Sequence, residues 1–415
     1  MAKTVALDPR TLAWARERFA RYYADVEVEP PDRFPRREFA AFPFTEQTLM
    51  RRHASFRAAD EFRAYLAREA PRHVYYSSAY YTAPDHPTMA QKGWLGADVI
   101  FDLDADHLRG AETLDYPAQL RRVKDRVRDL YDEFLRGDFG IPEAMMSLVF
   151  SGGRGYHVHV HDPAYLSLTS PERRELVEYI QGTGVDPTDA IAETHEGGGE
   201  GSAEGGDGSA RPARVRTFRQ LHDPATPGWR GRITRSLQAM LEHWDAVGVD
   251  ATRAELEALG LAPGVAASLA KSLVTRGRGV QIRDRLTLEV FAKRVPPAFL
   301  STVLAQAAIV VQGETDAPVT TDIHRLIRLP NSRHGGTGLR VAPLSRGDLD
   351  AFDPWRDAVP PSGGRTATVE LVDAVDYPFV PDPVRGRGGD RITVAEAAAV
   401  FLVLRGEARL PPGSG

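Results

Sequence analysis

The sequence predicts a mixed α/β (α+β) fold into which a helical subdomain is inserted. Between residues 37 and 160, short segments rich in β-branched and aromatic residues alternate with amphipathic helical segments. Residues 211–295 instead carry mainly helical patterns, and a low-complexity, glycine-rich run at 197–210 precedes them. We therefore expect residues 1–196 and 301–415 to form one α/β domain, 197–210 a flexible loop and 211–300 the helical subdomain.

Helix and strand signals follow one another at the start of the chain. Residues 8–23 predict a helix, because Leu12, Ala15 and Phe19 recur at close to helical spacing. The next expected elements are strands at 37–44 and 50–56, a helix at 58–68 and a strand at 73–81.

The most informative strand spans residues 99–106, where an apolar start is followed by alternating acidic residues. Side chains at i and i+2 of a strand project to the same face, so Asp102 and Asp104 should lie together, with Cα atoms roughly 6.5–7 Å apart. Two carboxylates this close repel each other unless a cation lies between them, and Mg²⁺ or Mn²⁺ prefers such oxygen ligands. The alternative is an acidic turn without a ligand.

Residues 116–136 predict a strongly amphipathic helix, and a further helix is expected at 171–180. One face of the first helix carries Leu120, Val123, Val127, Leu130 and Phe134. The opposite, charged face suits solvent contact; the alternative is a track along a DNA backbone.

Residues 146–160 predict a strand, a glycine turn and a second strand. The turn, Ser151-Gly-Gly-Arg-Gly155, lets the backbone approach a ligand closely and can present amides to an anion. Arg154 adds a guanidinium suited to phosphate, and His157 is the histidine nearest the glycines. The alternation of His157, His159 and His161 also suggests zinc, but the anion-binding turn and the absence of thiolates favour phosphate.

The third informative stretch, residues 314–339, supplies another acid and another histidine. Asp316 is the candidate carboxylate, and His334 lies beside a second glycine turn. Between them we expect a helix at 321–329, ended by Pro330. A strand at 341–344, a Pro/Gly-rich segment at 360–390 and a helix at 393–405 complete the chain.

Composition narrows the classes of function. The 415 residues include no Cys, which excludes disulfides, thiolate zinc sites and cysteine nucleophiles. No long apolar run or signal peptide is evident, so we expect a cytoplasmic protein without membrane association. The net charge of −5 counts against a generally basic nucleic-acid binder, although arginines between 211 and 235 could form a local basic surface. Only five of the 52 basic residues are Lys.

Together, the three informative stretches suit nucleotidyl transfer. Three carboxylates can hold two metal ions about 3.5–4 Å apart, which clamp the attacking and leaving oxygens of an in-line displacement. Glycine amides, arginines and histidines can bind a triphosphate and stabilise charge as pyrophosphate leaves.

Over most of its length the sequence resembles the small, catalytic subunit of archaeal and eukaryotic-type DNA primase. The resemblance is strongest to the archaeal branch, and the Arg-rich, Lys-poor usage is similar to that of haloarchaeal proteins. The family's landmarks occur in order: Arg37-Glu-Phe, Arg52-His-Ala-Ser-Phe56, Tyr75-Tyr-Ser-Ser-Ala79, Phe101-Asp-Leu-Asp-Ala-Asp106, Phe150-Ser-Gly-Gly-Arg-Gly-Tyr-His157, Asp322-Ile-His-Arg-Leu-Ile-Arg-Leu-Pro330 and Ala399-Val-Phe-Leu-Val-Leu-Arg-Gly-Glu-Ala408.

The resemblance implies a mixed-sheet catalytic domain with an inserted helical subdomain. It also implies that Asp102, Asp104 and Asp316 are catalytic and hold Mg²⁺ or Mn²⁺ in a two-metal site. The residues matching nucleotide contacts are Ser151, Arg154, His157, Arg328, His334 and, less closely, Arg52. The implied activity is template-directed synthesis of short RNA (or DNA) primers on single-stranded DNA from nucleoside triphosphates. The implied partner is an iron–sulfur large subunit.

The sequence departs from the family's pattern at two places. The family usually carries a Cys/His zinc knuckle near the acidic strand; because this chain has no Cys, we expect no zinc. Gly336 stands where the family usually has Lys, and we expect Arg333 or Arg340 to supply the missing cation.

Two other functions remain as alternatives. An end-joining repair polymerase of the same superfamily shares the Asp-x-Asp and Ser-Gly-Gly-x-Gly-x-His motifs, but the helical insert and the segment from Leu326 to His334 favour primase. The other is a non-catalytic nucleic-acid-binding scaffold, which would tolerate loss of the carboxylates.

Overall fold

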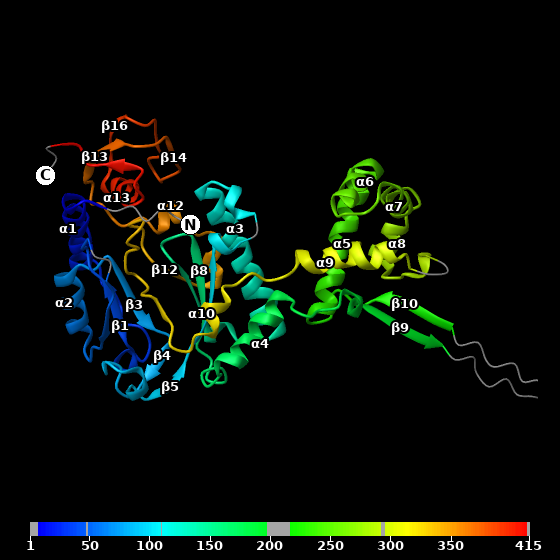
Figure 1. Ribbon diagram of the computed structural model, residues 1–415, viewed down its shortest axis with the longest axis horizontal. Helices are drawn as coiled ribbons and strands as arrows, with labels where there is room; N and C mark the ends of the chain where they lie inside the picture. The colour runs from blue at the N-terminus through cyan, green and yellow to red at the C-terminus, as the bar shows by residue number, and fades with distance from the viewer. Residues whose placement is uncertain (1–6, 47–48, 109, 197–215, 292–294, 413–415) are drawn as a thin grey trace, which may run out of the picture. The chain divides into compact units, whose positions relative to one another are not determined.

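The computed structural model describes residues 7–46, 49–108, 110–196, 216–291 and 295–412. The chain forms two compact units, one made of residues 1–177 and 314–415 and the other of residues 178–313 (Figure 1). The boundaries expected at 197, 211 and 301 fall inside the second unit. The expected glycine-rich loop at 197–210 lies outside the described residues.

The first unit has the mixed α/β character that the sequence predicts. Its strands are β1 (Phe39–Phe42), β2 (Arg51–Ala54), β3 (His73–Ser77), β4 (Ala79–Tyr81), β5 (Trp94–Ala97), β6 (Val99–Asp104), β7 (Met146–Phe150), β8 (Gly155–Val160), β11 (Leu326–Arg328), β12 (Ala342–Leu344), β13 (Thr366–Leu371), β14 (Val375–Tyr377), β15 (Val384–Gly386), β16 (Arg391–Ala395) and β17 (Ala408–Arg409). Its helices are α1 (Pro9–Asp25), α2 (Ala59–Glu69), α3 (Tyr116–Asp129), most of α4 (Ser170–Gln181), α10 (Ala317–Thr321), α11 (Arg346–Leu349), α12 (Pro354–Asp357) and α13 (Glu396–Leu404).

Two four-stranded sheets dominate this unit, with strand orders β11-β3-β1-β2 and β12-β7-β8-β6. The family resemblance led us to expect a sheet with both parallel and antiparallel strands. Every ladder between the strands of the described residues is instead antiparallel. The reason is local at β7 and β8, because the turn from Ser151 to Arg154 is too short for the crossover that a parallel pair needs.

Aromatic packing fixes α1 and α2 to the first sheet. Phe19 from α1, Phe39 from β1 and Phe62 from α2 are all buried in one core. The Phe39 and Phe62 rings lie 5.0 Å apart, and Phe19 meets Phe44 edge-on at 4.8 Å. Such burial of large apolar side chains is the main driving force for the layer.

Helix α3 has the apolar face that its periodicity predicts. Leu120, Val123 and Val127 are buried, and the helix packs against β6 and β8 (Figure 1). It begins at an Asp115 N-cap, whose carboxylate accepts from Ala118 N at 2.8 Å. Beyond Asp129 the chain continues as a π-helix over Leu130–Asp138.

The prediction of a helix at 321–329 was wrong. A five-residue helix, α10, ends at Thr321, and Leu326–Arg328 forms β11, which pairs antiparallel with β3. The strand expected at 73–81 is likewise two strands, broken at Ser78, whose N–H donates to Arg325 O at 2.7 Å. In both cases long-range backbone pairing decided the conformation of a short apolar segment.

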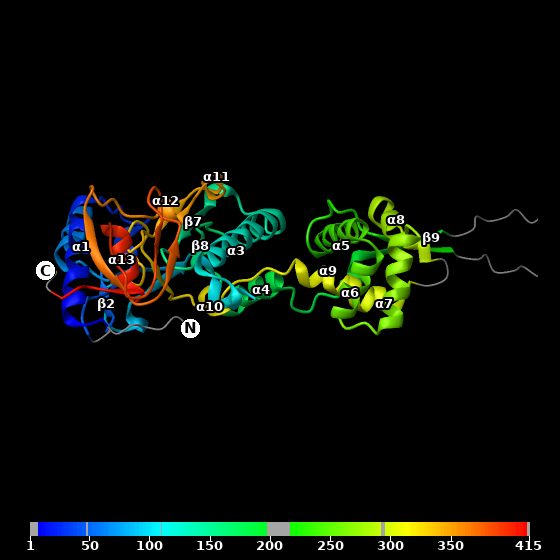
Figure 2. The same ribbon diagram turned by 90° about the horizontal axis from the view of Figure 1, so that it is seen from above.

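The second unit is mostly helical, as predicted, but contains a hairpin that was not (Figure 2). Its helices are α5 (Trp229–Val247), α6 (Val249–Ala258), α7 (Pro263–Ala270), α8 (Arg278–Arg285) and α9 (Ala305–Val310). The hairpin pairs β9 (Ile191–Glu196) with β10 (Arg216–Leu221), so the start of the expected helical subdomain is a strand. No helix of the described residues is both long and apolar enough to cross a bilayer.

Candidate active site

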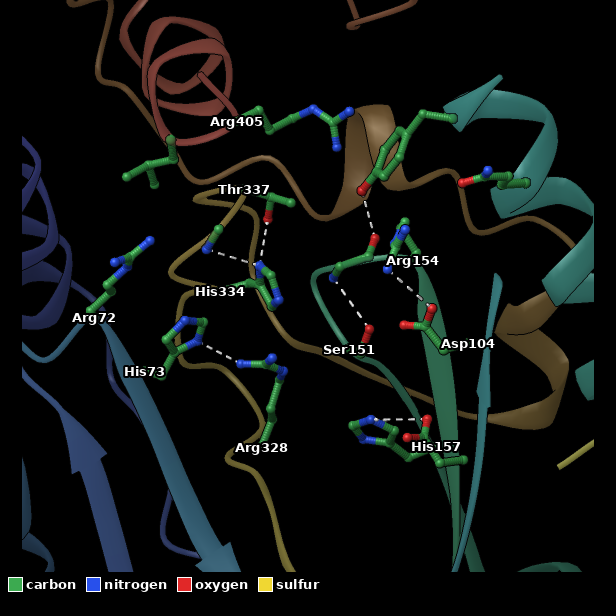
Figure 3. A pocket seen from close by; sticks show the side chains of 16 residues that line it. Arg72, His73, Asp104, Ser151, Arg154, His157, Arg328, His334, Thr337 and Arg405 are labelled. Atoms are coloured by element: carbon green, nitrogen blue, oxygen red, sulfur yellow. Dashed lines mark hydrogen bonds and ion pairs between the residues drawn. The ribbon is translucent and has the colours of Figure 1, made fainter. Parts of the chain in front are cut away.

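A cavity of about 630 Å³ in the first unit gathers most of the predicted site residues (Figure 3). Both four-stranded sheets, α3 and the end of α13 contribute to its wall. The lining residues are Arg72, His73, Asp102, Asp104, Tyr116, Gln119, Ser151, Gly153, Arg154, His157, Arg328, His334, Gly336, Thr337, Leu404 and Arg405.

The acidic pair projects into the cavity from β6. Phe101 and Leu103 are buried, whereas Asp102 and Asp104 are partly exposed and line the pocket together. Pairing with β8 places Asp102 opposite His157 and Asp104 opposite Gly155. The two carboxylates therefore share a face, as the period-2 pattern predicts.

Asp316 approaches this pair from a distant part of the sequence. Its backbone N–H donates to Asp102 O at 2.8 Å, and the neighbouring Thr315 hydroxyl donates to the same oxygen at 3.3 Å. Its own carboxylate is not among the groups that line the cavity; it lies 4.0 Å from His107 Nδ1. The backbone contact fixes Asp316 beside β6.

Electrostatics at Asp102 indicate that the nearby arginines do not offset burial and the neighbouring acids. Burial, together with the nearby Asp104 and Asp316 carboxylates, raises the pKa of Asp102 to about 7. This donor set suits a hard divalent cation. Among the described residues no three His, Asp or Glu side chains are already arranged to hold a metal ion. Asp316 would therefore have to move closer for all three acids to share one ion.

The raised pKa of Asp102 gives a testable pH dependence of stability. The folded-state pKa of Asp102 lies above the ordinary value of 3.8. The contribution of Asp102 to the free energy of unfolding is therefore fully present below about pH 4 and is lost as pH rises toward 7. We expect Asp102→Asn to stabilise the metal-free protein by up to about 4 kcal/mol at pH 8, and by much less at pH 5. Chemical denaturation at the two pH values measures this, and an equal effect at both would contradict it.

The glycine turn is held together by Ser151. The Ser151 hydroxyl accepts from Gly153 N and Gly155 N, both at 3.2 Å, so these two amides are not free to bind an anion as the sequence suggested. Gly152 has φ +73°, and a Cβ there would lie 2.8 Å from His334 Cβ. A Cβ at Gly155 would lie 2.4 Å from Leu103 O. Both positions thus require glycine.

Arg154 points from this turn toward the acids. Its guanidinium forms an ion pair with Asp106 and lies 3.6 Å from Asp104 Oδ1. Without a ligand, Arg154 is thus the nearest countercharge to the acidic pair, and it is partly exposed to the cavity.

His157 is buried beside Asp102, with Nε2 3.6 Å from Asp102 Oδ1. Burial lowers its pKa to about 3, so the ring is neutral near pH 7, and its Nδ1 has no hydrogen-bond partner. The other two histidines of the triplet have separate partners: Tyr76 for His159, and Asp98 with Ser147 for His161. His157 alone of the three lines the cavity.

Across the cavity, Arg328 and His334 lie beside a histidine that the sequence did not single out. Arg328 donates to His73 Nδ1 at 2.6 Å, and Gly335 N donates to the same atom at 3.2 Å. His334 Nδ1 accepts from Gly336 N at 3.2 Å. Burial lowers the pKa of both histidines, so the positive charge on this wall comes from Arg328 and Arg72.

Three arginines proposed from the sequence lie elsewhere. Arg52 is on β2, outside the cavity wall, and pairs with the buried Glu38 at 3.0 Å. Arg333 is buried, donates to Gly338 O at 2.9 Å and lies over the Phe19 ring, whereas Arg340 donates to Asn331 Oδ1 and Asp357 O. Neither Arg333 nor Arg340 lines the cavity, so the expectation that one of them replaces the absent Lys is wrong. Both are committed to packing by contacts that no local pattern reveals.

Four further residues line the cavity that the sequence did not single out: Arg72, His73, Tyr116 and Arg405. Tyr116 donates to Gly153 O at 2.6 Å and so ties α3 to the glycine turn. Arg405, paired with Glu407, lies over the Tyr116 ring at 4.4 Å. Arg72 and His73 precede or begin β3. Arg405 falls within a quoted landmark, but Arg72 had no local signal.

Comparison with known proteins agrees with this arrangement of motifs. Residues 101–346 match the family described as DNA primase small subunit. Relatives named DNA primase small subunit PriS include one from Methanothrix thermoacetophila, 39% identical over 97% of this chain and 100% of its own length. Others are from Methanocella arvoryzae (38% identical; 98% and 96% covered) and Haloarcula marismortui (37%; 97% and 99%).

Proposed function

This chain belongs to the DNA primase small subunit family, and from that premise we propose that it is a catalytic subunit that synthesises primers. The reaction is template-directed nucleotidyl transfer on single-stranded DNA, with nucleoside triphosphates as substrates and short RNA, or DNA, as product. The observation that carries the proposal is one cavity with paired carboxylates on β6 and with arginines and histidines on the facing wall.

In this proposal the acids bind the metal ions and the arginines bind the phosphates. Asp102, Asp104 and Asp316 would hold Mg²⁺ or Mn²⁺, which supplies a two-ion clamp on the attacking and leaving oxygens. Arg328, and Arg154 once released from Asp104 and Asp106, bind the phosphates and stabilise the charge that develops on pyrophosphate. The neutral His157 donates from one ring nitrogen to a phosphate oxygen near Asp102.

We also propose a partner subunit, a template and a location in the cell. An iron–sulfur large subunit pairs with this chain and assists initiation, and the template is single-stranded DNA. The protein acts in the cytoplasm. No zinc contributes to the chemistry.

Primer-free initiation is the deciding test. The chain, supplied with its large subunit, single-stranded template, Mg²⁺ or Mn²⁺ and nucleoside triphosphates, is expected to make new strands that begin with a triphosphate. Products are resolved on a denaturing gel with a γ-labelled nucleotide, and a matched reaction contains an annealed primer. Extension of the primer without initiation would favour the end-joining repair polymerase, and no incorporation in either reaction would favour a scaffold.

A further inference from the structure

Arg72 is a cation on the cavity wall without a countercharge. It precedes β3, and burial lowers the pKa of its guanidinium, so its charge is incompletely compensated. Its Nε donates to Gly335 O at 2.9 Å, and no carboxylate of the described residues forms an ion pair with it. Holding a desolvated guanidinium unpaired costs free energy, which an anionic ligand would recover.

Arg72 lines the cavity, and among the described residues its two terminal amino groups form no hydrogen bond. Gly335 makes the close approach possible, because a Cβ there would lie 2.3 Å from Arg72 Cγ and 2.4 Å from Arg72 O. A guanidinium anchored through Nε presents its two terminal amino groups as a fork, the geometry that matches two phosphate oxygens.

Arg72 lies on the opposite side of the cavity from the acids. Figure 3 shows Arg72 and His73 on one side, Asp104 and Arg154 on the other, and Arg328 and His334 between them. Burial and the Arg328 charge lower the pKa of His334 most, and smaller contributions from both Arg72 and Arg154 agree with this intermediate position. A bound triphosphate would extend from the acids toward Arg72.

We infer that Arg72 binds the terminal phosphate of the incoming nucleoside triphosphate. The inference rests on the proposed function, because it assumes that the reacting α-phosphate lies at Asp102 and Asp104. Arg72 then distinguishes a triphosphate from a diphosphate, whereas Arg328 and His334 contact the phosphates between.

The test measures the affinity of the full chain for ATP and for ADP in the presence of Mg²⁺. The variants are Arg72→Gln and Arg72→Lys, and the control is Arg68→Gln. Arg68 is an exposed arginine of α2 that pairs with Glu69, and its replacement should change nothing. We expect Arg72→Gln to weaken ATP binding roughly 10- to 100-fold, the loss typical of a charge-assisted contact, with ADP affinity nearly unchanged. Arg72→Lys keeps the charge but not the fork, so its loss should be smaller and again confined to ATP.

Different results would contradict the role of Arg72 and the proposed primase function. Unchanged ATP affinity in Arg72→Gln, or an equal loss for ATP and ADP, would overturn it, since equal losses mean that Arg72 only supports the turn at Gly335. Thermal unfolding identifies a misfolded variant, in which case the ATP-to-ADP ratio of Arg72→Lys decides. A wild-type chain that binds neither nucleotide would refute the proposed function itself.

Discussion

Replacing Asp104 with Asn is expected to lower nucleotide incorporation by at least about 10³-fold while the protein stays folded. Asn keeps the side-chain oxygen that accepts from Asp106 N at 3.0 Å, so the end of β6 should be preserved. It removes the negative charge that would bind the cation. Gel-based incorporation and thermal unfolding, measured on the same preparation, test both halves of the prediction.

The matched control is Asp125→Asn on α3. Asp125 is an exposed carboxylate that pairs with Arg128, away from the cavity wall, so its loss should leave incorporation unchanged. Asp102→Ala should abolish synthesis as Asp104→Asn does. Near wild-type activity in either cavity variant would rule out catalysis by this acidic pair.

Asp316→Asn is expected to lower incorporation by about 10²-fold or more, whereas Asp322→Asn should remain close to wild type. The two acids flank the short helix α10, and only the environment of their side chains separates them. Asp316 occupies the N-cap position but makes no side-chain capping bond, so its carboxylate is available to a ligand. Asp322 instead accepts from His324 N at 2.9 Å, a local role that Asn can keep.

This pair of variants also tests the choice of third carboxylate. A large loss in Asp322→Asn with activity retained in Asp316→Asn would transfer the role to Asp322. Incorporation close to wild type in both variants would mean that Asp102 and Asp104 act without a third acid. Incorporation at several Mn²⁺ concentrations gives the expected signature, since loss of a metal ligand raises the concentration required.

The local sequence pattern predicted the structure correctly wherever the neighbouring residues in the sequence determine a residue's environment. The alternation around Asp102 and Asp104 predicted their shared face, and the glycines after Phe150 predicted a tight turn between two strands. The apolar stripe from Leu120 to Phe134 predicted the buried face of α3 and of the π-helix that continues it.

Local pattern failed where a distant segment decided the outcome. Leu326–Arg328 has an apolar spacing that suits a helix, yet it pairs with β3 because that strand offers unpaired backbone groups. Arg333 and Arg340 looked like free cations beside the glycine turn, but Gly338, Asn331 and Asp357 engage them.

The sequence by itself determined the fold class, the family and the shared face of Asp102 and Asp104, since periodicity and motif order are properties of the chain. The role of Asp316 as the third acid stays a prediction. Only the tertiary structure decided which cations face those acids. Burial and ion pairing depend on groups far apart in sequence, which is why Arg52 pairs with Glu38 outside the cavity while Arg72, with no local signal, lines it.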